Sequence, residues 1–306
     1  MAKKISVIIP NYNGEKLLAK NLPQVFKNTQ GAEIIVVDDA STDNSVNLVK
    51  EEFGKVKVIE QQKNGGFAHS VNTGVKAASG DLVLLLNSDV APTPGFLKPA
   101  TDHFKDSNLF AVGLMDLSHE DGKVINRGRG GAKFQKGFLM HFAMSNESGE
   151  TLWVSGGSSL IDKKKFLELG GFDEIYAPFY WEDIDLGYRA QKEGYICIFE
   201  PKSQVEHYHQ EGAIKKNFSP SFVKTTSYRN QFLFVWKNIS DYQFLIEHLM
   251  WLPINIAKSF IALDWPFLLG FTKALFKLPQ LVFNYQQETV NDKLSDKEII
   301  KKFEKP

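Results

Sequence analysis

The stretch KVKVIEQQKNGGFAHSVNTGVKAASGDLVLLLNSD (residues 55–89) has the pattern of one strand–helix–strand unit. Short runs rich in valine, isoleucine and leucine stand near both ends, and a segment of helical character, residues 66–78, lies between them. Two parallel strands need a crossover of this kind, whereas antiparallel strands can be joined by a short turn. The stretch therefore predicts parallel strands in one sheet.

The same alternation extends over the first hundred residues. Strands are expected at ISVIIP (5–10), EIIVVDD (33–39), KVKVIEQ (55–61) and DLVLLLN (81–87), with helices at residues 14–28, 43–53 and 66–78. We predict an α/β fold, in which a Rossmann-like, mostly parallel sheet carries helices on both faces. Ligands of such sheets bind beyond the carboxyl ends of the strands, so those ends should carry the chemistry.

The composition narrows the class of protein further. The chain has 306 residues, of which 43% are hydrophobic, and its 36 basic and 36 acidic side chains cancel, so no general nucleic-acid binder is indicated. The single cysteine, Cys197, lies among apolar residues and is expected in the core of a protein from a reducing compartment. The apolar run after the basic start is too short for a secretory signal, so we expect a cytoplasmic protein.

Four polar segments follow the four expected strands: PNYNG (10–14), DDAS (38–41), QKNGGFA (62–68) and NSD (87–89). Turn formation alone explains any one of them. Four in succession at one sheet edge predict a binding site there. The chain contains neither the G-x-G-x-x-G dinucleotide pattern nor the G-x-x-x-x-G-K-[ST] phosphate loop, so those two nucleotide-binding modes are not indicated.

Residues 108–150 are glycine-rich, as in NRGRGGAKFQKG (126–137), and are expected to be irregular. They form either a surface loop or a lid that folds Arg127, Arg129 and Lys133 over an anionic ligand. After residue 212 the pattern becomes helical, at about 219–237, 241–263, 265–287 and 295–303. Residues 249–285 are rich in Trp, Phe and Leu, but lysines and prolines interrupt them, so we expect no simple membrane span.

Several segments occur together in a recognisable order and spacing. They are SVIIPNYNG (6–14), IIVVDDAS (34–41), the stretch 64–90, GGSSLIDKKKFLELGGFDE (156–174), FYWEDIDLGYRA (179–190) and VEHYH (205–209). Over residues 4–237 the chain resembles the family 2 glycosyltransferases, which have the GT-A fold, and in particular rhamnosyltransferase-like enzymes of bacterial polysaccharide and O-antigen synthesis. The resemblance implies a GT-A domain at 1–215, with a nucleotide-binding half (1–107) and an acceptor and catalytic half (108–215), followed by a helical region at 216–306.

The function implied by the resemblance is inverting transfer of a sugar from a UDP- or dTDP-linked donor to a hydroxyl of a glycan or lipid-linked oligosaccharide, in bacterial cell-surface polysaccharide synthesis. In the family, Tyr12 stacks on the nucleobase and Asp39 accepts from its ring N–H. The other expected donor contacts are Pro10, Asn11, Asn13, Asp38, Asn64, Gly65, Asn87 and Ser88. Asp38 and Asp39 could instead cap the following helix.

The segment NSD stands where the family has its metal-binding D-x-D motif. Asp89 matches the last carboxylate of that motif, a ligand of Mg²⁺ or Mn²⁺, and His207 matches the histidine that completes the site. Asn87 replaces the first carboxylate, which removes one charge and weakens the expected metal binding. A plain turn at the end of the strand is the alternative, and His209 competes with His207 for the histidine role.

Three carboxylates, those of Glu182, Asp183 and Asp185, fall within four residues at an expected helix start. The helix macrodipole favours negative charge there, which is the structural explanation. The resemblance makes Asp183 the catalytic base, whose pKa its acidic neighbours would raise by repulsion. Other predicted contacts are Gly156 and Gly157, which leave room for sugar and acceptor, and Trp181, which either faces a sugar or packs internally.

The aromatic and lysine-rich tail suits a face that lies in the membrane interface, at the inner side of the cell membrane. An ordinary helical subdomain or a homodimer interface are the alternatives. Two other function classes remain open. One is a sugar nucleotidyltransferase, which needs a phosphate loop that PNYNGEKL does not resemble. The other is a catalytically silent nucleotide-sugar-binding module, which only the replacement at Asn87 supports.

Overall fold

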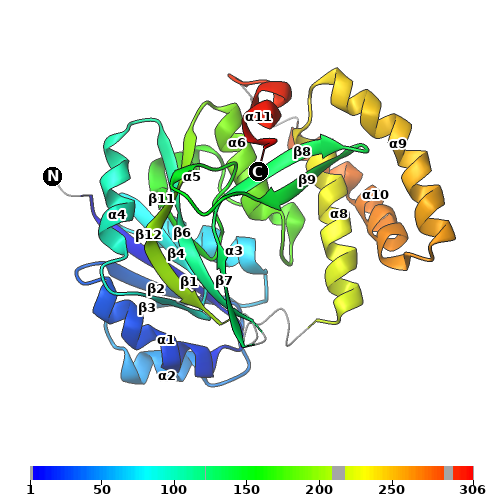
Figure 1. The fold of residues 1–306 in the computed structure, drawn as a ribbon. Helices are drawn as coiled ribbons and strands as arrows, with labels where there is room; N and C mark the ends of the chain where they lie inside the picture. The colour runs from blue at the N-terminus through cyan, green and yellow to red at the C-terminus, as the bar shows by residue number, and fades with distance from the viewer. Residues whose placement is uncertain (1–2, 121, 209–217, 286–291, 306) are drawn as a thin grey trace.

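The computed structural model describes residues 3–120, 122–208, 218–285 and 292–305. These residues form one ten-stranded sheet with helices packed on it, and a separate two-stranded hairpin (Figure 1). The strand order is β10-β12-β6-β11-β4-β1-β2-β3, with β5 paired to β12 and β7 paired to β6. The predicted parallel half of the sheet is present. Strand β1 (Ile5–Asn11) pairs in parallel with β2 (Glu33–Asp38) on one side and with β4 (Leu82–Leu86) on the other, and β3 (Lys57–Glu60) pairs in parallel with β2.

The second half of the sheet is mixed. Strand β11 (Ser158–Asp162) runs antiparallel to β4 and β6, whereas β12 (Ile196–His207) runs parallel to β6 (Leu109–Glu120). The short strands β5 (Val90–Pro92), β7 (Lys123–Arg127) and β10 (Gly149–Glu150) extend it. This arrangement aligns the end of β12, at His207, with the segment after β4.

The expectation that residues 108–150 are irregular is wrong. They form β6, β7, β10 and the hairpin of β8 (Gly130–Gln135) and β9 (Phe138–Ala143). Some of the glycines there serve close packing, because a Cβ on Gly130 would lie 2.2 Å from the Trp153 ring, whereas Gly122 and Gly137 have positive φ angles at the turns between strands. The predicted lid is also not seen: Arg127 pairs with Glu120, and Arg129 donates to the carbonyl of Glu150.

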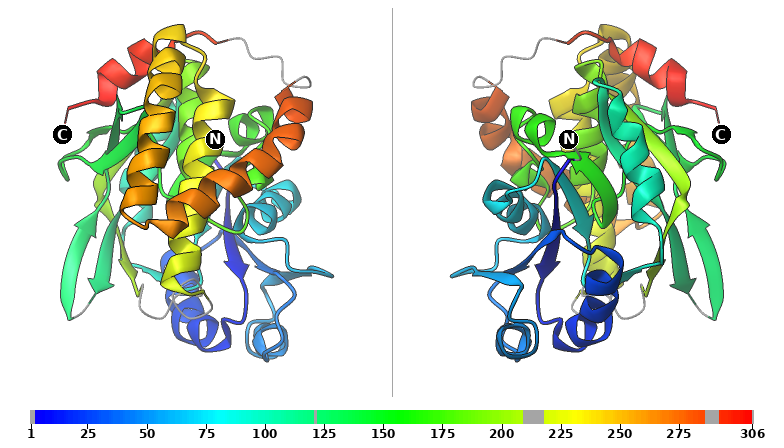
Figure 2. Two further views of the ribbon diagram at one scale, coloured as in Figure 1. Left: turned by 90° about the vertical axis from the view of Figure 1, so that its right-hand side faces the viewer. Right: turned by 90° about the vertical axis from the view of Figure 1, so that its left-hand side faces the viewer.

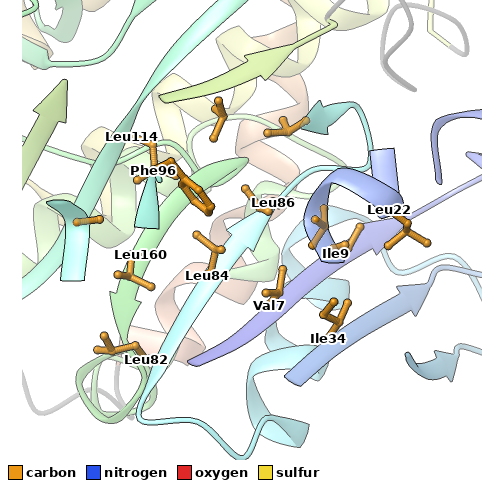
Figure 3. Close-up of a cluster of buried hydrophobic side chains, with 14 of the residues drawn as sticks. Val7, Ile9, Leu22, Ile34, Leu82, Leu84, Leu86, Phe96, Leu114 and Leu160 are labelled. Carbon is orange, nitrogen blue, oxygen red and sulfur yellow. The ribbon is translucent and has the colours of Figure 1, made fainter. Parts of the chain in front are cut away.

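The three N-terminal helices are confirmed as α1 (Glu15–Asn28), α2 (Ser45–Glu52) and α3 (Phe67–Ala77). On one face of the sheet Val7, Ile9 and Leu84 pack with Leu22 of α1 (Figure 3). On the other face Ile8 belongs to a second core, which includes residues of α3 and, further along the sheet, Cys197, which is buried as expected. The alternation of Val7, Ile8 and Ile9 between two cores is the period-2 signature of a strand covered on both sides. Shorter helical elements are α4 (Leu97–Asp102), η1 (His103–Lys105), α5 (Lys163–Glu168) and η2 (Glu174–Tyr176).

The predicted C-terminal helices are α8 (Pro220–Asn238), α9 (Tyr242–Ile261), α10 (Trp265–Tyr285) and α11 (Asp296–Phe303). Helices α8, α9 and α10 lie together beside the sheet, and α11 packs on β8 and α6 (Figure 2). Their buried side chains form one core with the β8–β9 hairpin and with α6 (Glu182–Lys192). This core includes Phe138, Trp181, Tyr188, Phe232 and Ile300. The expected domain boundary at 215 lies outside the described residues.

Candidate active site

One hydrogen-bond network ties together the carboxyl ends of β1 and β2. Asn11 Nδ2 donates to Asp38 Oδ1 at 2.9 Å, and the Ser41 hydroxyl donates to the same oxygen at 2.6 Å. Asn11 Oδ1 is buried without a hydrogen-bond partner. Because buried polar atoms are nearly always hydrogen-bonded in folded proteins, this oxygen is a candidate contact for a ligand.

The PNYNG segment places its side chains in two ways. Asn13 has a left-handed backbone (φ 50°), and its Oδ1 accepts from the Thr42 amide at 2.7 Å, so its side chain holds the 41–43 segment. Tyr12 is partly exposed beside it, and Pro10 lies within β1. Of these residues, Tyr12 has the position and the exposed ring that a stacking contact needs.

Asp39 joins the β2 end to the glycine pair of the next segment. Its two carboxylate oxygens accept from the amides of Gly65 and Gly66, at 2.8 and 2.9 Å. Burial raises the pKa of Asp39, although these two N–H groups act in the opposite direction. The alternative of helix capping is not seen, because Asn44 occupies the N-cap of α2. Asn64 is exposed next to this junction.

The NSD segment forms a tight turn that contacts the Gly156–Gly157 pair. The Val90 amide donates to Asn87 O at 3.1 Å, and Asn21 of α1 donates to Ser88 O at 2.8 Å. A Cβ on Gly157 would lie 2.5 Å from Asn87 Nδ2, so Gly157 is required by the close approach of Asn87. The space expected to receive sugar or acceptor at this glycine is thus occupied by the protein's own side chain, and Phe67 fills the space at Gly156 in the same way. Asn87 Oδ1 is buried and has no partner.

Asp89 and His207 meet next to this turn. Asp89 Oδ1 lies 3.3 Å from His207 Nε2, and Asp116 Oδ2 lies 2.5 Å from His207 Nδ1. All three side chains are buried. Burial would lower the pKa of His207, but hydrogen bonds to the two carboxylates and their negative charges raise it to about 9. The pocket therefore favours a positive charge between its carboxylates.

This donor set fits a divalent cation. Asp89 Oδ1 and His207 Nε2 face each other at 3.3 Å, and a carboxylate oxygen and an imidazole nitrogen are ligands that would hold such a cation. Asp116 would orient the ring through its other nitrogen, as carboxylates commonly do behind a histidine ligand. Within the part of the chain that the structure describes, no group of three or more His, Cys, Asp or Glu is arranged to hold a metal ion. Further ligands would come from groups other than the described His, Cys, Asp and Glu side chains, such as substrate and water. His209 lies outside the described residues.

The three clustered carboxylates begin α6 and have three different surroundings. Asp183 is partly exposed; its Oδ1 accepts from the Ile184 amide at 2.8 Å and its Oδ2 from the Gly156 amide at 3.4 Å. Burial raises the pKa of Asp183 against these N–H groups. The expected cause, repulsion by its acidic neighbours, acts instead on Glu182, whose pKa is raised well above its ordinary value by burial and then by Asp183. Glu182 is buried, and its Oε2 has no partner.

Asp185 points away from the other two carboxylates and is wholly buried. It accepts from Arg189 Nε at 2.7 Å, from Asn238 Nδ2 at 2.8 Å and from the Tyr176 hydroxyl at 2.9 Å. Burial alone would raise its pKa, but Arg189, Lys237 and Asn238 hold the pKa well below its usual range. Asp185 is thus a structural ion-pair residue.

Trp181 follows the packing alternative. It is buried at the N-cap of α6 and contacts the rings of Phe234 and His141, with centroids 5.2 and 5.6 Å away. Its ring belongs to the core shared with the C-terminal helices and not to the surface around Asp183.

Hydrogen bonds connect the segments into one site at the carboxyl edge of the sheet. The Asn87 amide donates to Gly157 O at 3.0 Å, the Gly156 amide contacts Asp183, and the Phe67 amide reaches Pro178 O at 3.4 Å. A cavity of about 650 Å³ lies at the other edge, next to Ile5 and Leu82 at the strand starts, and is remote from these groups.

Sequence reasoning missed Asp116 and the α8 residues that surround Asp185. Asp116 falls in the stretch that was expected to be irregular, so its place in β6, next to the end of β12 that carries His207, had no visible signal. Asn238 and Lys237 reach Asp185 from more than fifty residues along the chain, which no local pattern reveals.

Comparisons with known proteins agree on the kind of fold. A family model described as glycosyl transferase family 2 matches residues 6–170. The chain is 27% identical over 245 residues to the chondroitin synthase of Escherichia coli, covering 70% of this chain and 35% of that protein. It therefore spans about a third of the length of that relative.

Two solved structures are similar at low sequence identity. One is GalNAc-T7 with UDP, GalNAc and Mn²⁺, with a TM-score of 0.64 and 17% identity, covering 79% of this chain and 49% of the other. The second is S. aureus TarS 1–349 in complex with UDP-GlcNAc, with a TM-score of 0.57 and 20% identity, covering 80% of this chain and 71% of the other. These likenesses show the fold.

Proposed function

Because the chain belongs to glycosyl transferase family 2, we propose that it moves a sugar from a nucleoside-diphosphate-sugar to a hydroxyl group of a glycan or lipid-linked oligosaccharide. One observation carries the proposal: Asp183, with a raised pKa, is joined through Gly156–Gly157 to the turn that bears Asp89, and Asp89 faces His207 at the end of β12. A base for the acceptor and a cation-favouring pocket for the diphosphate thus share one sheet edge.

The donor would lie across the ends of β1 to β4. Tyr12 would stack on the base, and Asp39 would accept from its ring N–H, since each of its oxygens keeps a second lone pair beside its bond to a glycine amide. Asn11 and Asn87, each with an unpartnered buried Oδ1, would contact ribose and diphosphate. The UDP and UDP-GlcNAc in the two similar structures support a UDP or dTDP donor.

Asp89 and His207 would hold Mg²⁺ or Mn²⁺, with Asp116 orienting His207. When bound, the cation neutralises charge on the departing diphosphate. The Mn²⁺ in the GalNAc-T7 structure supports this assignment. Asn87 supplies a neutral oxygen where the family has a carboxylate, so the pocket has one negative charge fewer.

Asp183 would take the proton from the acceptor hydroxyl as the oxygen attacks the anomeric carbon opposite the diphosphate, which inverts configuration. The amides of Gly156 and Ile184 hold its two oxygens and fix the direction from which it acts. Burial raises the pKa of Glu182 and hides its side chain, so the partly exposed Asp183 would be the site's accessible base. Residues 1–107 would bind nucleotide, 108–215 would carry the chemistry, and 216–306 would form the helical region.

The donor is identified by thermal unfolding of the purified protein with UDP-, dTDP- and GDP-sugars, each with Mn²⁺ and with chelator. We expect one UDP- or dTDP-sugar to raise the melting temperature, because a ligand that binds only the native state stabilises it by mass action. Release of nucleoside diphosphate from that donor would then distinguish an enzyme from a silent binding module. Release of pyrophosphate from a nucleoside triphosphate would instead indicate a nucleotidyltransferase.

The acceptor side involves the C-terminal helices and, we propose, the inner face of the cell membrane. Among the described residues, eighteen large hydrophobic side chains are exposed, and thirteen of them lie between Tyr242 and Val282. The α10 segment adds Lys273 and Lys277 and contains no acidic residue. Searched over the residues placed in the structure, no helix has the length and apolarity to cross a bilayer. An apolar face edged by lysines suits the headgroup region of anionic lipid.

We expect the double variant Ile261→Glu/Phe276→Glu to bind vesicles of phosphatidylglycerol and phosphatidylcholine more than tenfold less tightly than the wild type. Both side chains are more than 80% exposed, and each large apolar side chain removed from lipid contact costs about 1.5–3 kcal/mol. Sedimentation with vesicles measures the effect. Val124→Glu, at an exposed apolar position on β7, is the control, and equal loss in both variants would refute a docking role for α9 and α10.

A further inference from the structure

The backbone directly before Glu182 and Asp183 is held in an unusual conformation. Tyr180 and Trp181 have φ angles of 69° and 78°, in the left-handed region that residues with a side chain rarely adopt. Two such residues in succession persist only when the surrounding structure over-determines them. The direction in which α6 starts, and hence the position of Asp183, depends on what holds this pair.

Asn230 of α8 holds the segment from behind. It is fully buried, and its side-chain NH₂ donates to the carbonyls of Tyr176 at 2.8 Å, Phe179 at 3.0 Å and Tyr180 at 2.8 Å. The neighbouring Arg229 Nη2 donates to Tyr176 O at 3.1 Å and to Ala177 O at 2.5 Å. Arg229 Nε also donates to Asn230 Oδ1 at 2.9 Å, which fixes the orientation of the amide.

The same face of α8 is tied to the segment at its other end. Lys237 bridges Asp173 at 2.6 Å and Asp185 at 3.2 Å, and Phe234 packs on Trp181. The spacing from Asn230 to Phe234 and Lys237 follows one helical stripe. Residues 173–185 are therefore fastened to α8 before, at and after the left-handed pair.

We propose that Asn230 and Arg229 are positioning residues that set the place of Asp183 through the backbone of Tyr180 and Trp181. The inference rests on the proposed function, in which Asp183 is the base. It gives α8 a part in the reaction beyond packing: four carbonyl oxygens of one strained segment are bound by two side chains of one helix turn.

The test compares Asn230→Ala and Asn230→Asp with Phe232→Leu. Asn230→Asp keeps the size but replaces the donor by a carboxylate that faces carbonyl oxygens. Phe232 is equally buried on the same helix, but it packs against Phe138 and Phe267, so it controls for general loss of stability. For both Asn230 variants we expect kcat to fall about 10- to 100-fold, with the donor KM within about twofold of wild type, because a shift of about 1 Å in a catalytic group costs that much.

Two readouts separate positioning from mere destabilisation. Hydrogen exchange should rise in residues 176–184 of the Asn230 variants and stay unchanged there in Phe232→Leu. The split between kcat and KM should be absent from Phe232→Leu at a matched loss of melting temperature. Wild-type kcat in Asn230→Ala, or the same kcat loss in the control, overturns the proposal.

Arg229→Lys keeps the charge but loses the fork that reaches two carbonyls, and it serves the same test if the Asn230 variants do not fold. We expect a smaller fall in kcat, again at constant donor KM. The role of Asp183 is judged separately. Turnover that persists in Asp183→Asn would remove the base assignment itself, whereas an inactive Asp183→Asn beside a fully active Arg229→Lys and Asn230→Ala would remove only the positioning role.

Discussion

Replacing Asp183 by asparagine is expected to lower sugar transfer by about 10² to 10⁴ while donor affinity stays near that of the wild type. The amide keeps an oxygen that can accept from the Ile184 amide, so the local geometry survives, but it cannot take a proton from the acceptor. Transfer rate to a competent acceptor and donor affinity by calorimetry are measured on the same preparation. Near-wild-type turnover with an intact fold would refute the assignment. A loss of donor affinity in proportion to the rate would make Asp183 a binding or structural residue.

The pH dependence of the wild type gives a second view of the same group. Asp183 acts as a base only when ionised, and burial raises its pKa above the ordinary value. Activity should therefore fall on acidification at a higher pH than an exposed aspartate would give, and it should return as the pH rises. The fall of kcat/KM at low pH measures the pKa of the group that must be ionised. If the same fall persists in a slow Asp183→Asn variant, the pH dependence belongs to another group.

The neighbouring carboxylates provide matched controls. Glu182→Gln should lose less activity than Asp183→Asn, because burial already favours the neutral form of Glu182. Asp185→Asn should act on stability instead: it removes the buried carboxylate charge that Arg189 and Lys237 share, and breaking a buried ion pair costs about 3–5 kcal/mol. Loss of transfer only in a well-folded Asp185→Asn would move the base to that residue.

Replacing Asp89 by alanine is expected to abolish the Mn²⁺-dependent part of nucleoside-diphosphate binding, since only His207 of the two facing ligands remains. His207→Ala should weaken that part as well. Asp116→Asn, which acts only through the orientation of His207, should reduce metal affinity by about 10- to 100-fold. Calorimetry with Mn²⁺ and with chelator measures the difference for each variant.

Asp102→Ala, at an exposed carboxylate on α4, is the control for a change of net charge. It should leave the Mn²⁺ dependence as in the wild type. If the wild type binds nucleoside diphosphate equally well in Mn²⁺ and in chelator, the metal assignment fails. Neutralisation of the diphosphate by lysine or arginine side chains would then be favoured.

Local patterns were enough for the first half of the sheet and for the helices. Val7, Ile8 and Ile9 are all buried. A short apolar run of this kind, followed by the turn-forming segment PNYNG, indicates a strand that is covered on both faces and ends in a loop. The C-terminal helices were equally readable from the change of composition after residue 212. The ordered polar segments at the strand ends also pointed to the edge where Asp39, Asn87 and Asp183 are found.

What the sequence could not reveal depends on distant partners. The sequence does not distinguish a glycine in a loop from one that makes room for a packed ring, so Gly130, which lies against Trp153, was interpreted as part of an irregular segment. Arg189 and Lys237 separate Asp185 from Asp183. Arg189 lies one helical turn after Asp185, but Lys237 lies 52 residues further on, beyond the reach of a local pattern. Trp181 was ambiguous for the same reason, because Phe234 decides which way its ring faces.

The attachment of the Tyr176–Asp185 segment to α8 also bears on the order in which the protein matures during synthesis. The ribosome releases the strand ends that would bind nucleotide within the first ninety residues, whereas Asn230, 54 positions beyond Tyr176, emerges much later. A nascent chain would thus complete its nucleotide-binding loops well before the turn that aims Asp183. Chains that end before α8 would lack the contacts proposed to place Asp183, so we expect them to be inactive in sugar transfer.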